Sequence, residues 1–253
     1  YDKIVNADRI DQYSAAEKQE TTMLAAIVED KDMDKNSNLT VATKLPLTAQ
    51  KLKIKNIKLN GVSMTKDTIE IEKPGATMKF SFEAPANAET YLSLVGDIYA
   101  EKDAKEHFIT ARIKAPGVKY GHKFRIDAYT TGQKEYLFNL GYREGAVKTC
   151  TLKFVGTGTL KYKDLAIYSQ TMSNYADRVN ALKENSLQNA KAEKNTVTGN
   201  ITVDKDKMLV VTLPYQKGWT AYVDGKKTDI QRVNYQYIGI NLKKGTHDIK
   251  LHY

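Results

Sequence analysis

The feature of this sequence that most constrains its fold is a series of short alternating segments, separated by turn residues, over Leu39–Ser169. In Met78–Phe82, for example, apolar and polar residues alternate, which is the period of a strand with one buried face. Turn dipeptides such as Asn60-Gly61 separate the segments. Regular strands of this kind, with no helical segment between them, predict a jelly-roll-like β-sandwich over residues 44–170.

The segments before and after this part have different patterns. Between residues 8 and 29 apolar residues recur at roughly helical spacing, and a polar stretch follows, so residues 1–43 are expected to be a helical or partly disordered lead-in. In residues 171–193 the spacing of Tyr175, Val179 and Leu182 is helical and no glycine or proline interrupts it. This segment therefore predicts a connector helix.

The last part, residues 194–253, again consists of short alternating segments. Asp224-Gly225 lies between two of them, and this pair predicts a two-residue hairpin because both central residues of a type I′ turn need positive φ. We expect a smaller antiparallel β domain here. The predicted fold class is mainly β: a β-sandwich, a connector helix and a second antiparallel unit.

Positive charge is concentrated in the two predicted β parts. The net charge of +9 divides into −4 for residues 1–43, +8 for residues 44–170 and +5 for residues 171–253. A basic surface attracts polyanions, including anionic lipid head groups and phosphate-rich wall polymers. No nucleic-acid partner is expected, because the sequence has no Arg-rich arm, Cys/His finger or RNP-like motif. Lys51–Leu59 alternates lysines with apolar residues, which suits either a solvated strand face or an anion-binding stripe.

The sequence contains no recognisable catalytic or metal-binding motif. It has no nucleophile elbow, Walker loop or dinucleotide fingerprint, and no local pattern selects a pair of carboxylates. His247 and His252 fall on opposite faces of the last predicted strand, so they cannot share a metal ion. Cys150 lies in a strand pattern, which favours a buried, inert thiol. We expect no catalytic residue, no metal and no cofactor in this chain.

Tyrosine is unusually frequent, with 16 residues beside one tryptophan and six phenylalanines. A tyrosine combines a flat apolar ring with a polar hydroxyl, which suits sheet surfaces and also stacking on sugar rings. Most of these tyrosines are expected to be half-buried residues of the sandwich. The alternative is a shared aromatic ligand face, formed by Tyr120, Tyr129, Tyr136 and Tyr142.

Two features of the sequence suggest a piece of a longer protein. Its longest apolar run is the six residues Met23–Val28, whereas a membrane-spanning helix needs about twenty. It begins with Tyr1 and has no apolar signal-peptide core. We interpret the chain as an excised domain.

Three motifs near the C-terminus support this interpretation. They read Pro-Tyr-x-x-Gly-Trp at Pro214–Trp219, x-Val-Asp-Gly-Lys at Tyr222–Lys226 and Gly-x-His-x-Ile-x-Leu-x-Tyr at Gly245–Tyr253. In this order and at this spacing, the motifs resemble the YfhO family of bacterial membrane proteins.

The resemblance implies that this chain is part of a longer membrane protein, and that the function belongs to the whole protein. Proteins of that family are polytopic membrane proteins of Gram-positive bacteria, similar to GT-C-type glycosyltransferases that use a polyprenyl-phosphate sugar, and some are linked to glycosylation of lipoteichoic acid. A large extracytoplasmic domain lies late in their chains. The resemblance therefore implies a domain at the extracellular face of the cell membrane. Because the catalytic acidic residues of GT-C enzymes lie in the membrane part, it implies an active site outside this chain.

Two hypotheses of function follow. In the first, the chain is a non-catalytic domain that helps to position an anionic cell-wall glycopolymer, such as lipoteichoic acid, or a lipid-linked sugar. Its candidate ligand-binding residues from the motifs are Trp219, Tyr222, Asp224, Lys226 and Lys227. A structural interpretation of the same motifs is that the glycines form turns and the aromatic rings pack on the sheet. In the second hypothesis, the domain docks on the membrane region of its own full-length chain or on a partner protein.

Overall fold

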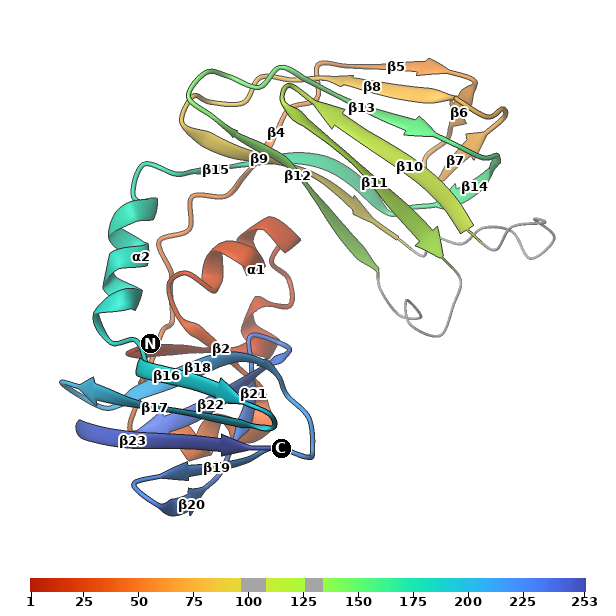
Figure 1. The fold of residues 1–253 in the computed structure, drawn as a ribbon. Coiled ribbons are helices and arrows are strands. Elements are labelled where there is room, and N and C mark those ends of the chain that lie inside the picture. The colour runs from red at the N-terminus through yellow and green to blue at the C-terminus, as the bar shows by residue number, and fades with distance from the viewer. Residues whose placement is uncertain (97–107, 126–133) are drawn as a thin grey trace. The chain divides into compact units, whose positions relative to one another are not determined.

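The computed structural model describes residues 1–96, 108–125 and 134–253 and confirms a mainly β fold (Figure 1). The chain divides into two compact units. The central unit comprises residues 15–17 and 48–173, and the terminal unit comprises residues 1–14, 18–47 and 174–253. Each unit is described by itself below.

The described residues of the central unit form three sheets, which lie where the sequence predicts the β-sandwich. The β10 sheet has the order β11-β10-β13-β8-β5 and consists of β5 (Asn56–Asn60), β8 (Thr77–Ser81), β10 (Phe108–Ala115), β11 (Val118–Arg125) and β13 (Thr149–Phe154). The β9 sheet has the order β12-β9-β15-β4 and consists of β4 (Gln50–Leu52), β9 (Ala88–Val95), β12 (Glu135–Arg143) and β15 (Asp164–Thr171). The β7 sheet pairs β6 (Val62–Met64), β7 (Thr68–Ile71) and β14 (Gly158–Lys161).

One apolar core joins these three sheets. Alternate residues of each strand face it, as the period of two requires, and Met78, Leu92 and Ile69 represent the three sheets in one cluster. Cys150 belongs to the same cluster and is 1% exposed, which confirms the expected buried thiol. Burial raises the pKa of this thiol to about 12, so it is a poor nucleophile at neutral pH.

The lysine-rich segment Lys51–Leu59, predicted as one strand, is two strands in different sheets. It begins in β4 and ends in β5, so the chain crosses from one sheet of the sandwich to another. Lys51 forms an ion pair with Asp164, with 3.0 Å between Nζ and Oδ2, and Lys55 pairs with Glu83. Part of the predicted stripe is therefore neutralised within the chain.

The terminal unit contains two sheets. The β22 sheet has the order β18-β22-β21-β2-β1-β3 and consists of β1 (Lys3–Asn6), β2 (Ala26–Val28), β3 (Thr40–Val41), β18 (Lys207–Pro214), β21 (Gln231–Val233) and β22 (Tyr237–Leu242). The β23 sheet has the order β16-β17-β23-β19-β20 and consists of β16 (Gln188–Glu193), β17 (Thr196–Val203), β19 (Thr220–Val223), β20 (Lys226–Thr228) and β23 (Gly245–His252). An apolar cluster with Ile201, Ile240 and Leu251 joins the two sheets.

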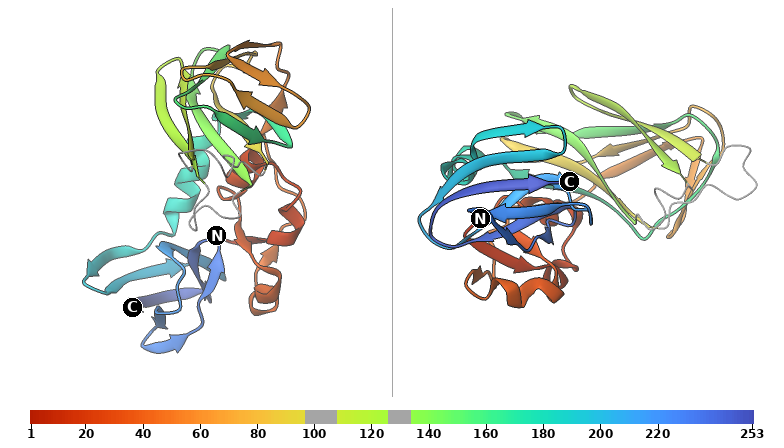
Figure 2. Two further views of the ribbon diagram at one scale, coloured as in Figure 1. Left: turned by 90° about the vertical axis from the view of Figure 1, so that its right-hand side faces the viewer. Right: turned by 60° about the horizontal axis from the view of Figure 1, so that its bottom comes forward.

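The N-terminal segment is not a separate lead-in. The 3₁₀ helices η1 (Ala7–Ile10) and η2 (Asp30–Asn36) and the helix α1 (Ala15–Thr21) connect β1, β2 and β3, which extend the β22 sheet. β1 pairs in parallel with both β2 and β3. The first strand of the chain, at the red end of the colour scale, therefore shares one sheet with the C-terminal strands β18, β21 and β22 (Figure 2).

The helical interpretation of residues 8–29 was wrong for β2 because a three-residue buried strand has no period of its own. Its apolar residues Ala26–Val28 are all buried. The backbone N–H of Ile27 donates to Oδ1 of Asn234 at 2.8 Å, a partner 207 residues away. Such a partner is invisible to local spacing.

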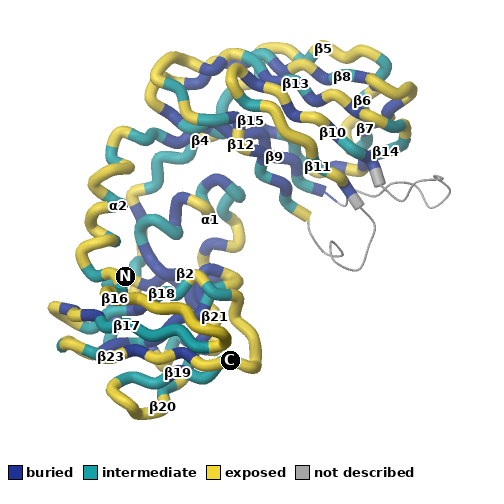
Figure 3. Tube along the Cα trace, in the orientation of Figure 1, coloured by how far each residue is buried: buried dark blue, intermediate teal, exposed yellow. Residues whose placement is uncertain are grey.

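The predicted connector helix over residues 171–193 is shorter in the structure. α2 spans Tyr175–Glu184 and has no buried residue (Figure 3). After it, Leu187 leaves the helical path and covers Gly199 of β17, where an added Cβ would lie 2.6 Å from Cγ of Leu187. The residues that follow form the edge strand β16 instead of a further helical turn.

Candidate functional site

The outward face of the β23 sheet brings together a tyrosine and three lysines. In β23, Ile249 and Leu251 are buried, so the alternate residues Asp248, Lys250 and His252 point outward. Strand register then fixes their neighbours. One row across the five strands reads Lys191, Thr198, Lys250, Tyr222 and Lys227. We call these five residues the Tyr222 row.

A groove of about 800 Å³ lies over this row. Its lining includes Lys191, Tyr222 and Lys250 from the row, with Asn200, Asp248 and His252 from the rows beside it. Among the residues that the structure describes, none forms an ion pair with Lys191, Lys227 or Lys250, and none bonds the hydroxyl of Tyr222. The three ammonium groups and the tyrosine hydroxyl of the row are therefore available to bind a ligand from solvent.

The groove also contains neutral and acidic hydrogen-bonding groups. Oδ1 of Asn200 accepts from Nδ2 of Asn189 at 3.2 Å, and Nδ1 of His252 lies 3.0 Å from Oγ1 of Thr196. Asp248 contributes an exposed carboxylate. Ammonium groups bind phosphate, a tyrosine ring stacks on a sugar, and carboxylate and amide groups bind hydroxyls. The arrangement is suited to binding an anionic sugar-containing ligand.

Two of the five candidate residues from the motifs lie in the Tyr222 row. Tyr222 and Lys227 are register partners, and Lys226 is exposed next to them on β20. Trp219 lies on the opposite side, because the residues at alternate positions from it, Ala221 and Val223, pack toward the core. Trp219 is therefore not a residue of this groove.

Trp219 packs within the terminal unit. Its ring meets that of Tyr253 edge-on, with 5.1 Å between the ring centroids. Gly218 leaves room for this contact, because a Cβ there would lie 2.7 Å from Cε2 of Tyr253. The hydroxyl of Tyr253 donates to Oε1 of Gln216 at 3.1 Å. The Gly-Trp and terminal Tyr of the motifs thus support the fold.

Asp224 is also a structural residue. With Gly225 it forms the predicted hairpin turn, and both have positive φ, 53° and 76°. Its Oδ1 accepts from the backbone N–H of Asp248 at 2.9 Å, and its Oδ2 accepts from Nδ1 of His247 at 2.8 Å. These two bonds fasten the β19–β20 hairpin to β23.

His247 is held between two acceptors. Nδ1 faces the Asp224 carboxylate, and Nε2 lies 2.8 Å from the carbonyl oxygen of Lys243. A carbonyl oxygen and an ionised carboxylate both only accept, so both ring nitrogens donate, which is the imidazolium form. The hydrogen bond to Asp224 raises the pKa of His247 and lowers the pKa of Asp224.

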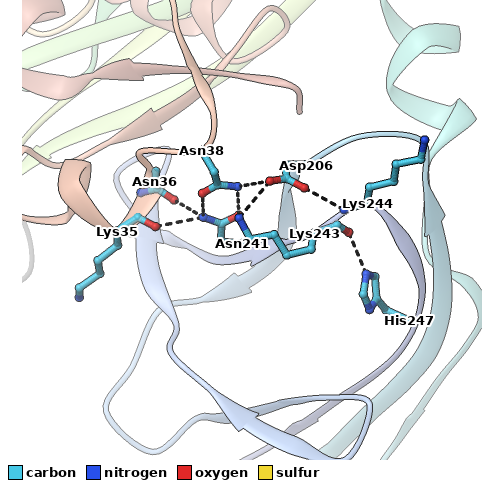
Figure 4. Close-up of polar contacts among 8 residues, drawn as sticks. All are labelled: Lys35, Asn36, Asn38, Asp206, Asn241, Lys243, Lys244 and His247. Carbon is cyan, nitrogen blue, oxygen red and sulfur yellow. Dashed lines mark hydrogen bonds and ion pairs between the residues drawn. The ribbon is translucent and has the colours of Figure 1, made fainter.

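A polar network next to His247 ties the N-terminal segment to the C-terminal hairpin (Figure 4). Nδ2 of Asn38 donates to Oδ2 of Asp206 at 2.8 Å, and Nδ2 of Asn241 donates to Oδ1 of Asn38 at 2.9 Å. Asp206 also accepts from the backbone N–H of Lys244 at 2.8 Å and from Nζ of Lys243 at 3.0 Å. This network fixes Lys243 and Lys244, which directly precede the Gly-x-His motif, and the carbonyl oxygen of Lys243 is one of the two partners of His247.

The four tyrosines of the central unit do not share a face among the residues described. Tyr136 is 4% exposed and packs against Phe124 and Phe138 inside the sandwich, because its position in β12 is on the face of the strand that points toward the core. Tyr120 and Tyr142 are exposed, but they lie on β11 and β12, which belong to different sheets. Tyr120 is 36% exposed, and the partial burial of its side chain raises its pKa to about 12. Tyr129 lies outside the described residues.

No cluster of three or more histidine, cysteine or carboxylate side chains suited to a metal ion occurs within residues 1–96, 108–125 and 134–253. In the same ranges, no helix is long and apolar enough to cross a membrane.

Sequence reasoning missed most residues of the groove. The alternation in β23 was sufficient to place Asp248, Lys250 and His252 on one face. Lys191 and Asn200 depended on the pairing of β16 and β17, and residue 191 had been assigned to the predicted helix.

Comparison with known proteins places the sequence among bacterial membrane proteins. The model of the family described as "Bacterial membrane protein YfhO" matches residues 1–253. The YfhO protein of Bacillus subtilis (strain 168), which is uncharacterised, is 24% identical over 157 residues, or 58% of this chain and 18% of that protein. The chain therefore spans about a fifth of this relative.

Solved structures add little to this comparison. An allantoicase structure covers 81% of this chain and 86% of its own, with 9% identity and a TM-score of 0.25. Latent PorU from Porphyromonas gingivalis covers 83% of this chain and 21% of its own, with 9% identity and a TM-score of 0.24. At TM-scores this low, neither structure indicates a function.

Proposed function

Because the chain belongs to the YfhO family of bacterial membrane proteins, we propose that it is a non-catalytic domain that positions an anionic glycopolymer or a lipid-linked sugar. The observation that carries this proposal is the Tyr222 row, whose three lysines have no ion-pair partner among the described residues. Lys250 and Lys227 flank the ring of Tyr222, and Lys191, Tyr222 and Lys250 line an open groove. Lysines two strands apart in the row are about 10 Å from one another at the backbone. That spacing suits successive phosphates of a repeating polymer.

The activity of the whole protein is part of the same proposal. The full-length chain would be a GT-C-type glycosyltransferase with its active site in the membrane part, and this domain would lie at the extracellular face of the membrane. Lipoteichoic acid, a glycerol-phosphate polymer that carries sugars, combines the two chemistries that the groove offers. The domain would hold such an acceptor, or the donor lipid, near the catalytic site.

The proposal is tested by NMR titration of the chain with a glycerol-phosphate oligomer that carries sugars. The expected result is a set of shift changes at Lys191, Thr198, Tyr222 and Lys250, with smaller changes elsewhere. The double variant Lys191→Gln/Lys250→Gln should show only a small part of these shift changes at the same ligand concentration. Absence of shifts at millimolar ligand, or shifts gathered away from the β23 sheet, would exclude the groove as the binding site.

A second candidate function is supported by a separate cavity of the terminal unit. This cavity of about 640 Å³ is lined mainly by apolar side chains, among them Met23, Leu182, Leu187, Ile201 and Val211. An apolar cavity suits a hydrophobic segment, such as one from the membrane region of the full-length chain. Site-directed cross-linking from Ser186→Cys in the full-length protein tests this. A cross-link to the membrane region supports docking, and its absence argues against it.

A further inference from the structure

The outward face of the β10 sheet in the central unit carries seven cationic side chains and no acidic one at the positions described. The inward residues of its strands, such as Met78, Ile113 and Leu152, are buried, so the alternate residues point to solvent. The cations are Lys58, Lys79, Arg112, Lys114, Lys119, Lys123 and Lys153, and all are exposed. We call these seven residues the cationic face.

The other outward positions whose side chains the structure describes carry neither charge nor an aromatic ring. They are Asn56, Asn60, Thr77, Ser81, Thr110, Gly121, Thr149 and Thr151. The face therefore offers positive charge alone, over four strand spacings, or about 19 Å.

Strand register sets like charges directly opposite one another on this face. Lys58 lies opposite Lys79, Lys114 lies opposite Lys119, and Arg112 lies opposite Lys153. Directly opposed like charges destabilise a sheet. These six side chains form no ion pair with any residue in the described part of the chain. The repulsion among them is not relieved by any residue that the structure describes.

We propose that the cationic face docks on the surface of an anionic lipid bilayer. Charge complementarity and membership of a membrane-protein family support this occupant. The cations lie in neighbouring rows of a broad sheet face, as contact with a plane of head groups requires. This inference does not depend on the Tyr222 row.

The test is co-sedimentation of the chain with vesicles of equal parts phosphatidylglycerol and phosphatidylcholine, compared with pure phosphatidylcholine. Each lysine near an anionic surface contributes about fivefold to partitioning. The variant with Lys58, Lys79, Lys114 and Lys119 all changed to Gln should bind anionic vesicles at least about fiftyfold more weakly. A control with Lys66, Lys183, Lys217 and Lys244 changed to Gln has the same net charge and should bind within about threefold of the original chain.

Salt provides an independent criterion. Raising the ionic strength from about 0.1 M to about 1 M shortens the Debye length from about 10 Å to about 3 Å and should abolish binding. Equal binding to both kinds of vesicle would overturn the proposal, and so would equal loss in both quadruple variants. Binding of a soluble glycerol-phosphate polymer through the same four lysines, with no vesicle binding, would also overturn it. Circular dichroism confirms that both variants remain folded.

Discussion

Replacing Gly239 with alanine should destabilise the terminal unit, because the glycine makes room for two buried neighbours. An added Cβ would lie 2.5 Å from Cγ1 of Val233 and 3.0 Å from Sδ of Met208. Val233 is 0% exposed and Met208 is 1% exposed, so neither can move into solvent. Gly239 does not adopt the left-handed conformation, and backbone strain therefore plays no part.

The expected magnitude is a difference between two effects. Overpacking a core costs about 1–3 kcal/mol. Replacing glycine by alanine where the backbone permits it returns about 0.4–1 kcal/mol by restricting the unfolded chain. The net loss should be about 1–2 kcal/mol, or roughly 3–8 °C in Tm.

The Tm should be measured by tryptophan fluorescence during thermal unfolding, because the one tryptophan of the chain, Trp219, packs against the core of the terminal unit. The control is Gly239→Ala combined with Val233→Ala, which removes both Cγ atoms that the new Cβ would meet. In that background the substitution should cost at least about 1 kcal/mol less than it costs alone. A Tm unchanged by Gly239→Ala, or an equal cost in both backgrounds, would refute the packing argument.

Two further predictions concern charge. The hydrogen bond to Asp224 raises the pKa of His247 above its usual value of about 6.5, so its stabilisation is complete below that pH and is lost as the pH rises through the folded-state pKa. NMR titration should show the raised pKa of His247 returning toward about 6.5 in Asp224→Asn, and an unchanged pKa would contradict this. Lys58→Glu places a carboxylate opposite Lys79 and should stabilise the central unit by about 0.2–1 kcal/mol. Calorimetry checks this against Lys66→Glu, outside the cationic face, and equal gains would contradict the register argument.

Local signals in the sequence predicted local structure well. Asp224-Gly225 predicted a hairpin because the conformation of a type I′ turn belongs to the two residues themselves. The alternation around Met78 and Phe80 predicted inward-facing strand residues, since one period decides which side chains are buried. These features do not depend on distant partners.

Features that depend on distant pairing could not be predicted. β1 pairs with strands that follow two helical segments, and the β22 sheet is completed by residues more than 200 positions away in the chain. Lys191 and Lys250 lie in one row only because β16, β17 and β23 pair in a particular register. The motifs led to the correct family, but the distinction between Tyr222 at the surface and Trp219 in the packing required that register.

The central claim is that the Tyr222 row binds an anionic, sugar-containing polymer, and calorimetric titration of a glycerol-phosphate oligomer that carries sugars tests it most directly. Tyr222→Ala should weaken binding about tenfold, because loss of one aromatic stacking contact costs about 1–1.5 kcal/mol. Tyr142→Ala, which removes an exposed tyrosine of the other unit, is the matched control and should leave the Kd unchanged. An equal effect of the two substitutions, or no effect of Tyr222→Ala, would contradict the account.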